Sequence, residues 1–435
     1  MRRRGALAAL LVLVAALGGG LALLLSGGGE QPPSQPPPPT RSAPPPPSPG
    51  TTVPGGPSLA IGLTETNAAL IWSKDSGVDV GAFAPWRDRL AALRPRYLRV
   101  LVDWYHLQPQ PTTPPFDVVV DGCARGLPPC RPMGGLREML RAIRSQQRAG
   151  GGFEVVIDIY GVPPWAARPA SGCEMKHTSP RSRPITATGL KAYRALVRGL
   201  VALGREEGVP LRWWSAWNEP NGPFFVSPQR AECDPVALSL SPAVYTTFWR
   251  AMRDELRNAG GDRRMLLGEL ADGPPGRRLS TRAGEFLAAL PDDVVCGSSV
   301  MSQHAYTRRG PEADRPDVVR EVEGVLARRP CTRDMPIWLT EVGAGGPVPA
   351  EARTDGAAGA RLDCRLLNDD LRRWWADPRV TVAFQYTFRD DPAFPVGLVD
   401  AGLTHAWPTL DLLEAWGGNR APEAEPPPLP GRCDG

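Results

Sequence analysis

Two glutamates stand in matching positions, each at the end of a short apolar run. Glu219 follows the run 211–217 and belongs to an Asn-Glu-Pro motif, while Glu341 follows the run 336–340. Short apolar runs of this kind are typical of buried strands. Carboxylates at the ends of two strands can face each other across a pocket. Such a pair can cleave a glycosidic bond, one carboxyl donating a proton and the other acting as nucleophile or base.

The alternative is that each glutamate simply forms an ion pair with an arginine, since the chain has 50 Lys and Arg residues. The specific Asn-Glu-Pro context and the repeated strand-end position favour a catalytic pair over two unrelated ion pairs.

The elements that would position these carboxylates alternate along the chain from residue 58 onward. Predicted strands cover residues 59–63, 97–102, 153–159, 211–217, 265–270, 297–303, 337–340 and 380–386. Predicted helices cover residues 86–93, 136–148, 190–207, 243–259, 282–290, 318–328, 358–375 and 409–416. Eight alternating units predict an α/β fold, a single (β/α)8 TIM barrel with long βα loops. In such barrels functional groups gather at the C-terminal ends of the strands.

The motifs at these strand ends resemble those of the clan A glycoside hydrolases, and families 39 and 5 in particular. The resemblance covers residues 58–420. The Asn-Glu-Pro motif at 218–220 matches the motif after the fourth strand, and Thr-Glu at 340–341 matches the site after the seventh. The Pro-Pro-Trp-Ala stretch at 163–166 resembles the family's Pro-x-Trp loop.

The resemblance implies a retaining double displacement with Glu219 as acid/base and Glu341 as nucleophile. It also implies that Arg99 supports the nucleophile and that the Tyr306 hydroxyl bonds to it. Asn218 would bond to the sugar 2-hydroxyl. Structural roles are the alternatives, a strand-end cap for Asn218 and an ordinary strand-end aromatic for Tyr306.

Three further residues are predicted to contact substrate. His304 closes the sixth strand, with a structural histidine as the alternative. Trp165 and Tyr386 could stack on sugar faces, with core packing as the alternative. The chain departs from many clan members by lacking Trp at the end of strand eight. It also has Asp-Ile-Tyr at 158–160, where many members carry His on strand three. The resemblance therefore does not identify the sugar.

No cofactor and no metal are expected. The remaining histidines lack ligand spacing, and the sequence has no Cys-x-x-Cys, no Gly-x-Ser-x-Gly elbow and no phosphate-binding glycine motif. Of the formal charge of +4, the first 57 residues carry +3. A nearly neutral remainder argues against a nucleic-acid partner. The expected partner is a polysaccharide or glycoside, bound by a monomer.

The first 57 residues predict export. Residues 1–30 begin with three arginines, and the 21 uncharged residues 5–25 would span about 30 Å as a helix, one bilayer core. The positive start favours an uncleaved signal-anchor, with a cleaved signal peptide as the alternative. Residues 31–57 are nearly half proline, which predicts an extended linker. Residues 58–420 would be the barrel, placed on the extracellular face of the membrane or secreted, and 421–435 a Pro-rich tail.

The eight cysteines all lie in the exported part, where disulfides are the default. Their predicted placement suggests the pairs Cys123–Cys130, Cys173–Cys233, Cys296–Cys331 and Cys364–Cys433.

An exported retaining glycosidase is the favoured function. The alternative is a protein that binds carbohydrate on the same barrel without catalysis. The presence of both glutamates counts against this alternative, because a barrel that has lost its activity usually loses one of them. A transglycosylase would use the same residues, so the sequence does not separate it from a hydrolase.

Overall fold

In the computed structural model, eight parallel strands close into a barrel in chain order, with β8 pairing back to β1. The strands are β1 (Ala60–Thr64), β2 (Tyr97–Asp103), β3 (Glu154–Tyr160), β4 (Leu211–Ser215), β5 (Arg264–Leu270), β6 (Val300–His304), β7 (Ile337–Val342) and β8 (Val380–Tyr386). The predicted TIM barrel is confirmed. The structure describes residues 59–65, 84–119, 135–150, 152–170, 179–272, 279–309, 316–345, 356–391, 394–417 and 425–434.

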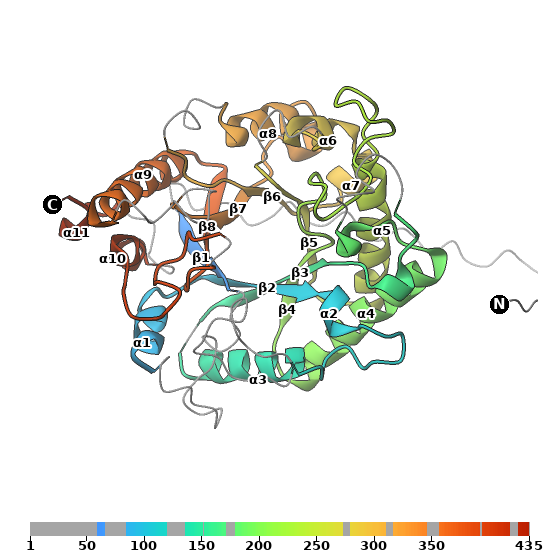
Figure 1. Cartoon of the computed structure of the whole chain (residues 1–435), viewed down its shortest axis with the longest axis horizontal. Helices are drawn as coiled ribbons and strands as arrows, with labels where there is room; N and C mark the ends of the chain where they lie inside the picture. Colours follow the sequence, from blue (N-terminus) through green and yellow to red (C-terminus); the bar gives the residue numbers. More distant parts are fainter. Residues whose placement is uncertain are drawn as a thin grey trace, which may run out of the picture. The chain divides into compact units, whose positions relative to one another are not determined.

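Helices surround this barrel (Figure 1). They are α1 (Ala84–Ala92), α2 (Trp104–Leu107), α3 (Gly135–Arg148), α4 (Ala187–Glu206), α5 (Ser241–Ala259), α6 (Ala283–Ala289), α7 (Asp292–Val295), α8 (Val318–Leu326), α9 (Gly356–Ala376), α10 (Pro408–Trp416) and α11 (Gly431–Asp434). The eight predicted helices are all present.

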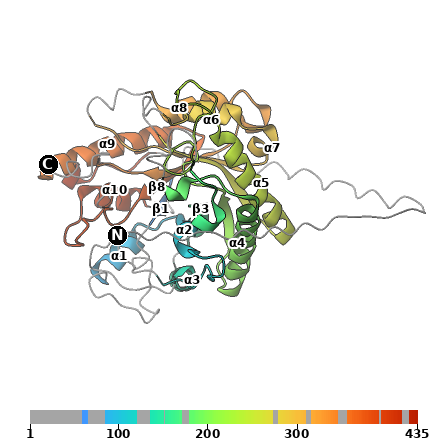
Figure 2. The same cartoon turned by 45° about the vertical axis from the view of Figure 1, so that its right-hand side comes forward.

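Local sequence explains how individual helices begin and which side they bury. Thr186 caps α4 by accepting a hydrogen bond from the Gly189 N–H at 2.9 Å, and Asp317 caps α8 in the same manner. An apolar stripe of α4 that includes Tyr193 and Leu200 is buried. Helices α4 and α5 pack side by side along the outside of the barrel (Figure 2).

The barrel interior is layered. The lower layer is apolar and contains four aromatic side chains, with ring centroids 4.4 Å apart for Tyr97 and Trp338 and 4.6 Å apart for Trp213 and Trp338. The fourth is Phe384. Side chains two positions further along a strand point to the same side. The next layer up is therefore built from the buried polar residues Thr64, Arg99, Asp158, Ser215, Ser302 and Thr340.

Gly62 of β1 lies where the aromatic layer leaves no room for a side chain. A Cβ at this position would lie 2.4 Å from the Phe384 ring. We expect Gly62→Ala to lower the free energy of unfolding by about 1–3 kcal/mol, because the packed ring must move. Gly324 in α8 is the control, since a Cβ there meets nothing within 4 Å. Gly324→Ala should raise stability by up to about 1 kcal/mol. Urea unfolding would measure both, and equal effects would contradict the packing argument.

Two of the predicted disulfides are confirmed, Cys296–Cys331 and Cys364–Cys433. Cys233 is also disulfide-bonded, but its predicted partner Cys173 and the pair Cys123–Cys130 lie outside the described residues.

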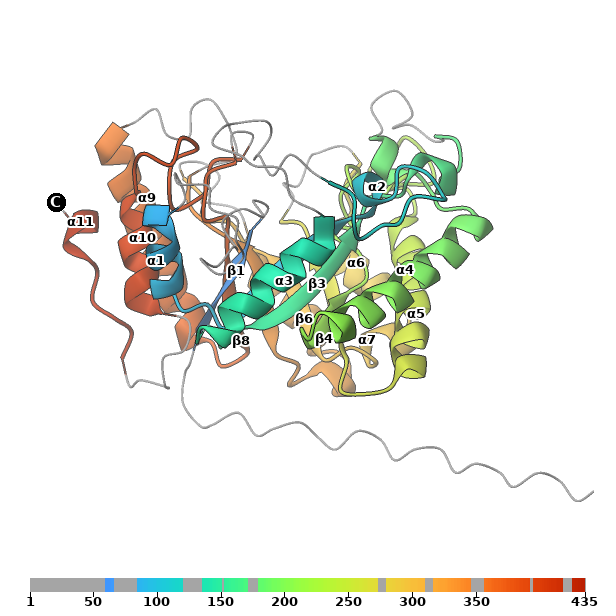
Figure 3. The same cartoon turned by 90° about the horizontal axis from the view of Figure 1, so that it is seen from below.

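The described C-terminal residues 425–434 pack against the barrel's helices. Cys433 is buried, its carbonyl accepts from Arg365, and the Pro427 carbonyl accepts from Arg372. Both arginines belong to α9, and α9, α10 and α11 lie together (Figure 3).

Among the described residues, no helix combines the length and the apolar character needed to cross a membrane. The predicted anchor within residues 1–30 and the predicted linker 31–57 lie outside the described residues.

Candidate active site

The two glutamates lie at the C-terminal ends of their strands. Glu219 follows β4, and Glu341 is the penultimate residue of β7. A carboxylate oxygen of one lies within 4.8 Å of a carboxylate oxygen of the other. The Glu219 side chain is 24% exposed and that of Glu341 only 8%. Glu219 is thus the more accessible of the pair.

The backbone holds Glu219 in an unusual conformation. Its φ is +38°, in the left-handed region that residues other than glycine rarely adopt. The Glu219 N–H donates to the Glu269 carbonyl at 2.9 Å, and Glu269 itself has a φ of +55°. Backbone strain of this kind gathers at functional sites, where the surrounding structure enforces it.

Glu341 is held by one cation and one hydroxyl. The Arg99 guanidinium donates to one carboxylate oxygen at 2.8 Å, and the Tyr306 hydroxyl donates to the other at 2.5 Å. Burial and the charge of Glu341 raise the pKa of Tyr306 well above its ordinary value, so this hydroxyl keeps its proton and remains a donor. Each Glu341 oxygen therefore has a hydrogen-bond donor in place.

Arg99 is fully buried and joins several strand ends. Besides Glu341, it contacts Asp158 at 2.7 Å, the Asn218 side-chain oxygen at 2.7 Å and Glu269 at 3.1 Å. Burial raises the pKa of Asp158 well above its ordinary value, more than Arg99 lowers it, which favours the neutral acid. Burial also acts to raise the pKa of Glu269, but Arg99 and His304 outweigh it and hold that pKa at about 2.

His304 lies between three carboxylates. Its Nδ1 is 2.9 Å from Glu219 and 3.4 Å from Glu341, and its Nε2 is 3.2 Å from Glu269. Burial alone would lower the pKa of His304, but Glu341 and the hydrogen bonds to Glu219 and Glu269 raise it to about 10. We therefore expect an imidazolium that donates from both nitrogens.

This charge makes the stability contributed by His304 depend on pH. The folded-state pKa of about 10 lies above the unfolded value of 6.5, so protonation stabilises the folded protein. That contribution is complete below about pH 6.5 and is lost as the pH rises toward about 10. We expect the stability difference between the parent and His304→Gln to shrink over this range. Urea unfolding from pH 6 to pH 10 measures it, and a difference independent of pH would contradict a charged His304.

Most of the predicted site residues come together. Glu219, Glu341, Arg99, Asn218, His304 and Tyr306 form one network of contacts. Tyr386, at the end of β8, joins by packing, with its ring 6.3 Å from that of Tyr306. Trp165 instead donates its indole N–H to the Gln108 carbonyl and packs edge-on against Trp104.

Two residues of the network are not among the predicted site residues. Glu269 and Asp158 are fully buried carboxyl groups that contact Arg99. The available signal was a charge inside an apolar run: 265–270 contains one glutamate and 153–159 contains Asp158. A charge inside a buried strand requires a partner, but the sequence does not say which partner.

Glu219, His304 and Glu341 present donor atoms close enough together for a metal ion. In the arrangement described, these atoms instead contact one another and their neighbours: Glu341 accepts from Arg99 and Tyr306, and His304 lies within hydrogen-bond distance of Glu219.

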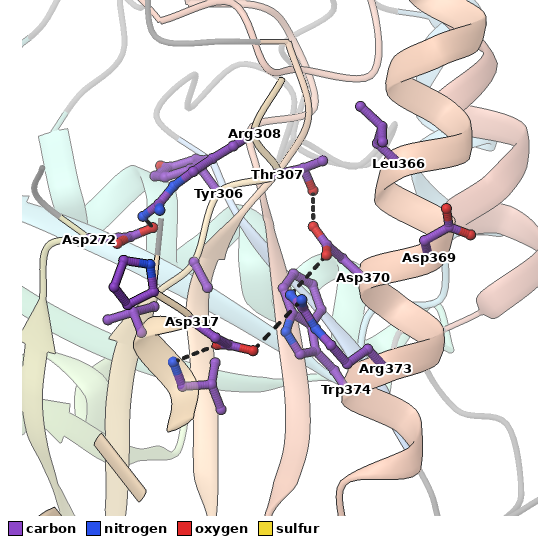
Figure 4. Close-up of a pocket in the computed structure, with 14 residues that line it drawn as sticks. Asp272, Tyr306, Thr307, Arg308, Asp317, Leu366, Asp369, Asp370, Arg373 and Trp374 are labelled. Atoms are coloured by element: carbon purple, nitrogen blue, oxygen red, sulfur yellow. Dashed lines mark hydrogen bonds and ion pairs between the residues drawn. The ribbon is translucent and has the colours of Figure 1, made fainter. Parts of the chain in front are cut away.

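A second hollow lies beside the site, between the end of β6 and helices α8 and α9, with Tyr306 in its wall (Figure 4). Several of its charged groups are held by neighbouring side chains. Asp370 accepts from Thr307 at 2.7 Å and from Arg373 at 2.8 Å, and Arg308 pairs with Asp272.

No protein-family model matches the sequence, and no curated protein matches it. Solved structures do. A monomeric β-xylosidase from Caulobacter crescentus CB15 superposes with a TM-score of 0.52 and 15% identity, covering 83% of this chain and 68% of that one. A family 39 glycoside hydrolase from Bacteroides cellulosilyticus WH2 gives 0.50 and 14%, covering 83% and 64%.

This chain therefore spans just under two thirds of the length of that family 39 enzyme. At such low identity the likeness shows the fold. The chain thus shares the closed eight-stranded barrel of these glycoside hydrolases.

Proposed function

We propose that this protein is a retaining glycoside hydrolase, with Glu219 as the acid/base and Glu341 as the nucleophile. The observation that carries the proposal is the short separation of two carboxylates with different surroundings. Retaining enzymes hold the two carboxyls about 5–5.5 Å apart, whereas inverting enzymes leave about 6.5–9.5 Å for a water molecule. Oxygens within 4.8 Å favour retention.

In the first step, a Glu341 oxygen attacks the anomeric carbon while the bond to the leaving oxygen breaks. Glu219 gives its proton to that oxygen, so a glycosyl ester and an ionised Glu219 result. The charge lost from Glu341 is thereby replaced on Glu219. His304, which contacts both carboxylates, can stabilise the charge on either one.

In the second step, Glu219 takes a proton from water, and the resulting oxygen attacks the anomeric carbon. The ester bond breaks, its electron pair returns to Glu341, and the sugar leaves with its original configuration. The donors on Glu341, Arg99 and Tyr306, are already in place to receive this charge.

The test is hydrolysis of aryl xylosides, glucosides, mannosides, galactosides and arabinofuranosides, and of cell-wall polysaccharides, by residues 58–435. Xylosides come first because the C. crescentus structure is that of a β-xylosidase. Turnover of one glycoside class would establish the activity and its sugar. Binding of a polysaccharide without turnover would favour a carbohydrate-binding protein instead.

We further propose that the enzyme is exported and acts outside the membrane. The uncharged segment 5–25 after three arginines supports an anchor, and disulfides among the described residues suit an oxidising compartment. Fractionation of cells expressing the full chain is the test. We expect activity in the membrane fraction, accessible from outside, and activity confined to the cytoplasm would contradict export.

A further inference from the structure

Glu269 is a buried carboxylate that the two-step reaction described above does not use. It lies near the end of β5, between the strands that carry Glu219 and His304. One of its oxygens lies 3.2 Å from His304 Nε2, 3.1 Å from the Arg99 guanidinium and 2.6 Å from the Thr340 hydroxyl, which donates to it. The same residue accepts the Glu219 N–H through its carbonyl. Glu269 is thus connected to both the backbone of the acid and the histidine beside it.

An ionised Glu269 fixes the proton on one nitrogen of His304, and its negative charge favours a second proton on the other. A carboxylate at Nε2 requires a proton on that nitrogen. The opposite nitrogen, Nδ1, lies 2.9 Å from Glu219 Oε1. If Nδ1 also carries a proton, it donates to Oε1, and the acidic proton of Glu219 must then be on Oε2. An unprotonated Nδ1 would instead accept a hydrogen bond from the Glu219 proton, and that proton would then be unavailable for donation to the leaving group.

We propose that Glu269 is a positioning residue that keeps His304 an imidazolium, so that the acidic proton of Glu219 stays on the oxygen opposite His304. This rests on the proposed glycosidase function. Glu269 acts through His304 and does not itself contact the reacting atoms.

Other charged and titratable groups face this pair from every neighbouring strand. They are Arg99 on β2, Asp158 on β3, Glu219 after β4, Tyr306 after β6 and Glu341 on β7, and Tyr245 of α5 accepts from the Gly268 N–H.

Asp158 provides a matched control for Glu269. It is equally buried and contacts the same Arg99 nitrogen as Glu269, but burial raises its pKa and favours its neutral form. Asp158→Asn therefore serves as a matched control for Glu269→Gln.

The first readout is the charge of His304, measured by 15N NMR of protein labelled at its four histidines. His304→Gln assigns the signal. In the parent we expect an imidazolium from pH 6 to pH 9. Glu269→Gln should lower the midpoint of this titration by about 2 pH units or more, and Asp158→Asn by less than about 1. A neutral His304 in the parent at pH 7 would overturn the proposal without any variant.

The second readout is the dependence of turnover on the leaving group. Glu269→Gln should lower kcat by about 100-fold for glycosides with poor leaving groups, which need the proton. For dinitrophenyl glycosides, which hardly need it, the loss should be below about tenfold. An equal loss for both substrates would indicate a merely structural role. If Glu269→Gln does not fold, Glu269→Asp, which withdraws the carboxylate from His304, should show both effects at reduced size.

These measurements separate the two proposals. A parent that hydrolyses no glycoside would defeat the proposed function, whereas the NMR titration would still decide whether Glu269 controls the charge of His304.

Discussion

Glu341→Ala is expected to lower kcat by about 10,000-fold or more on any glycoside that the parent hydrolyses, because loss of a nucleophile removes the covalent route. The fold should persist. Arg99, the buried cation that Glu341 neutralises, keeps its contacts with Asp158 and Glu269. Single-turnover and steady-state kinetics on the best aryl glycoside would measure the loss.

A matched control separates loss of chemistry from loss of an ion pair. The Glu207 side chain is also 8% exposed and is also held by arginines, but it lies at the end of α4. Glu207→Ala should cost stability and leave kcat nearly unchanged. Comparable losses of kcat in the two variants would mean that Glu341 acts only as a structural ion-pair partner.

Glu219→Ala is expected to show a loss that depends on the substrate. For poor leaving groups we expect kcat/KM to fall by about 100- to 10,000-fold, because proton donation is lost. Dinitrophenolate can leave without being protonated, so formation of the glycosyl ester from dinitrophenyl glycosides should change little. Attack of water on that ester, which lacks its base, should then limit turnover. Measuring kcat/KM and kcat across a series of aryl glycosides tests this.

Azide adds a chemical test of the same residue. Because Glu219 is partly exposed, its removal leaves space that a small anion can enter. Azide should partly restore turnover and give a glycosyl azide of retained configuration. Glu219→Gln, which keeps the volume, should respond less. A loss that is uniform across leaving groups and insensitive to azide would exclude the acid/base role.

The barrel itself could be predicted because its signals are local. Each strand is a short apolar run and each main helix has a buried stripe, so the eight predicted strands correspond to the eight observed. The differences occur at boundaries. β6 begins at Val300, not at residue 297, because the chain is still turning out of α7, with the Ser298 N–H donating to the Val295 carbonyl.

The site residues that could be predicted are those whose neighbours in the sequence form a recognisable pattern. Glu219 and Glu341 end apolar runs, and parallel strands bring such ends together. Glu269 gives no comparable signal, because its role depends on Arg99, His304 and Thr340, which lie far away in the chain. Trp165 was predicted from a local motif, and its contact with Trp104 leaves its role toward substrate a prediction.

The most direct test of the account is to trap the covalent intermediate. A 2-deoxy-2-fluoroglycoside with a dinitrophenyl leaving group, matched to the sugar found in the substrate panel, should inactivate the parent and leave one sugar on the protein. Peptide mass spectrometry should place that sugar on Glu341, and Glu341→Gln should remain unlabelled. Turnover without a trapped ester, with release of product of inverted configuration, would contradict the retaining mechanism and the role of Glu341.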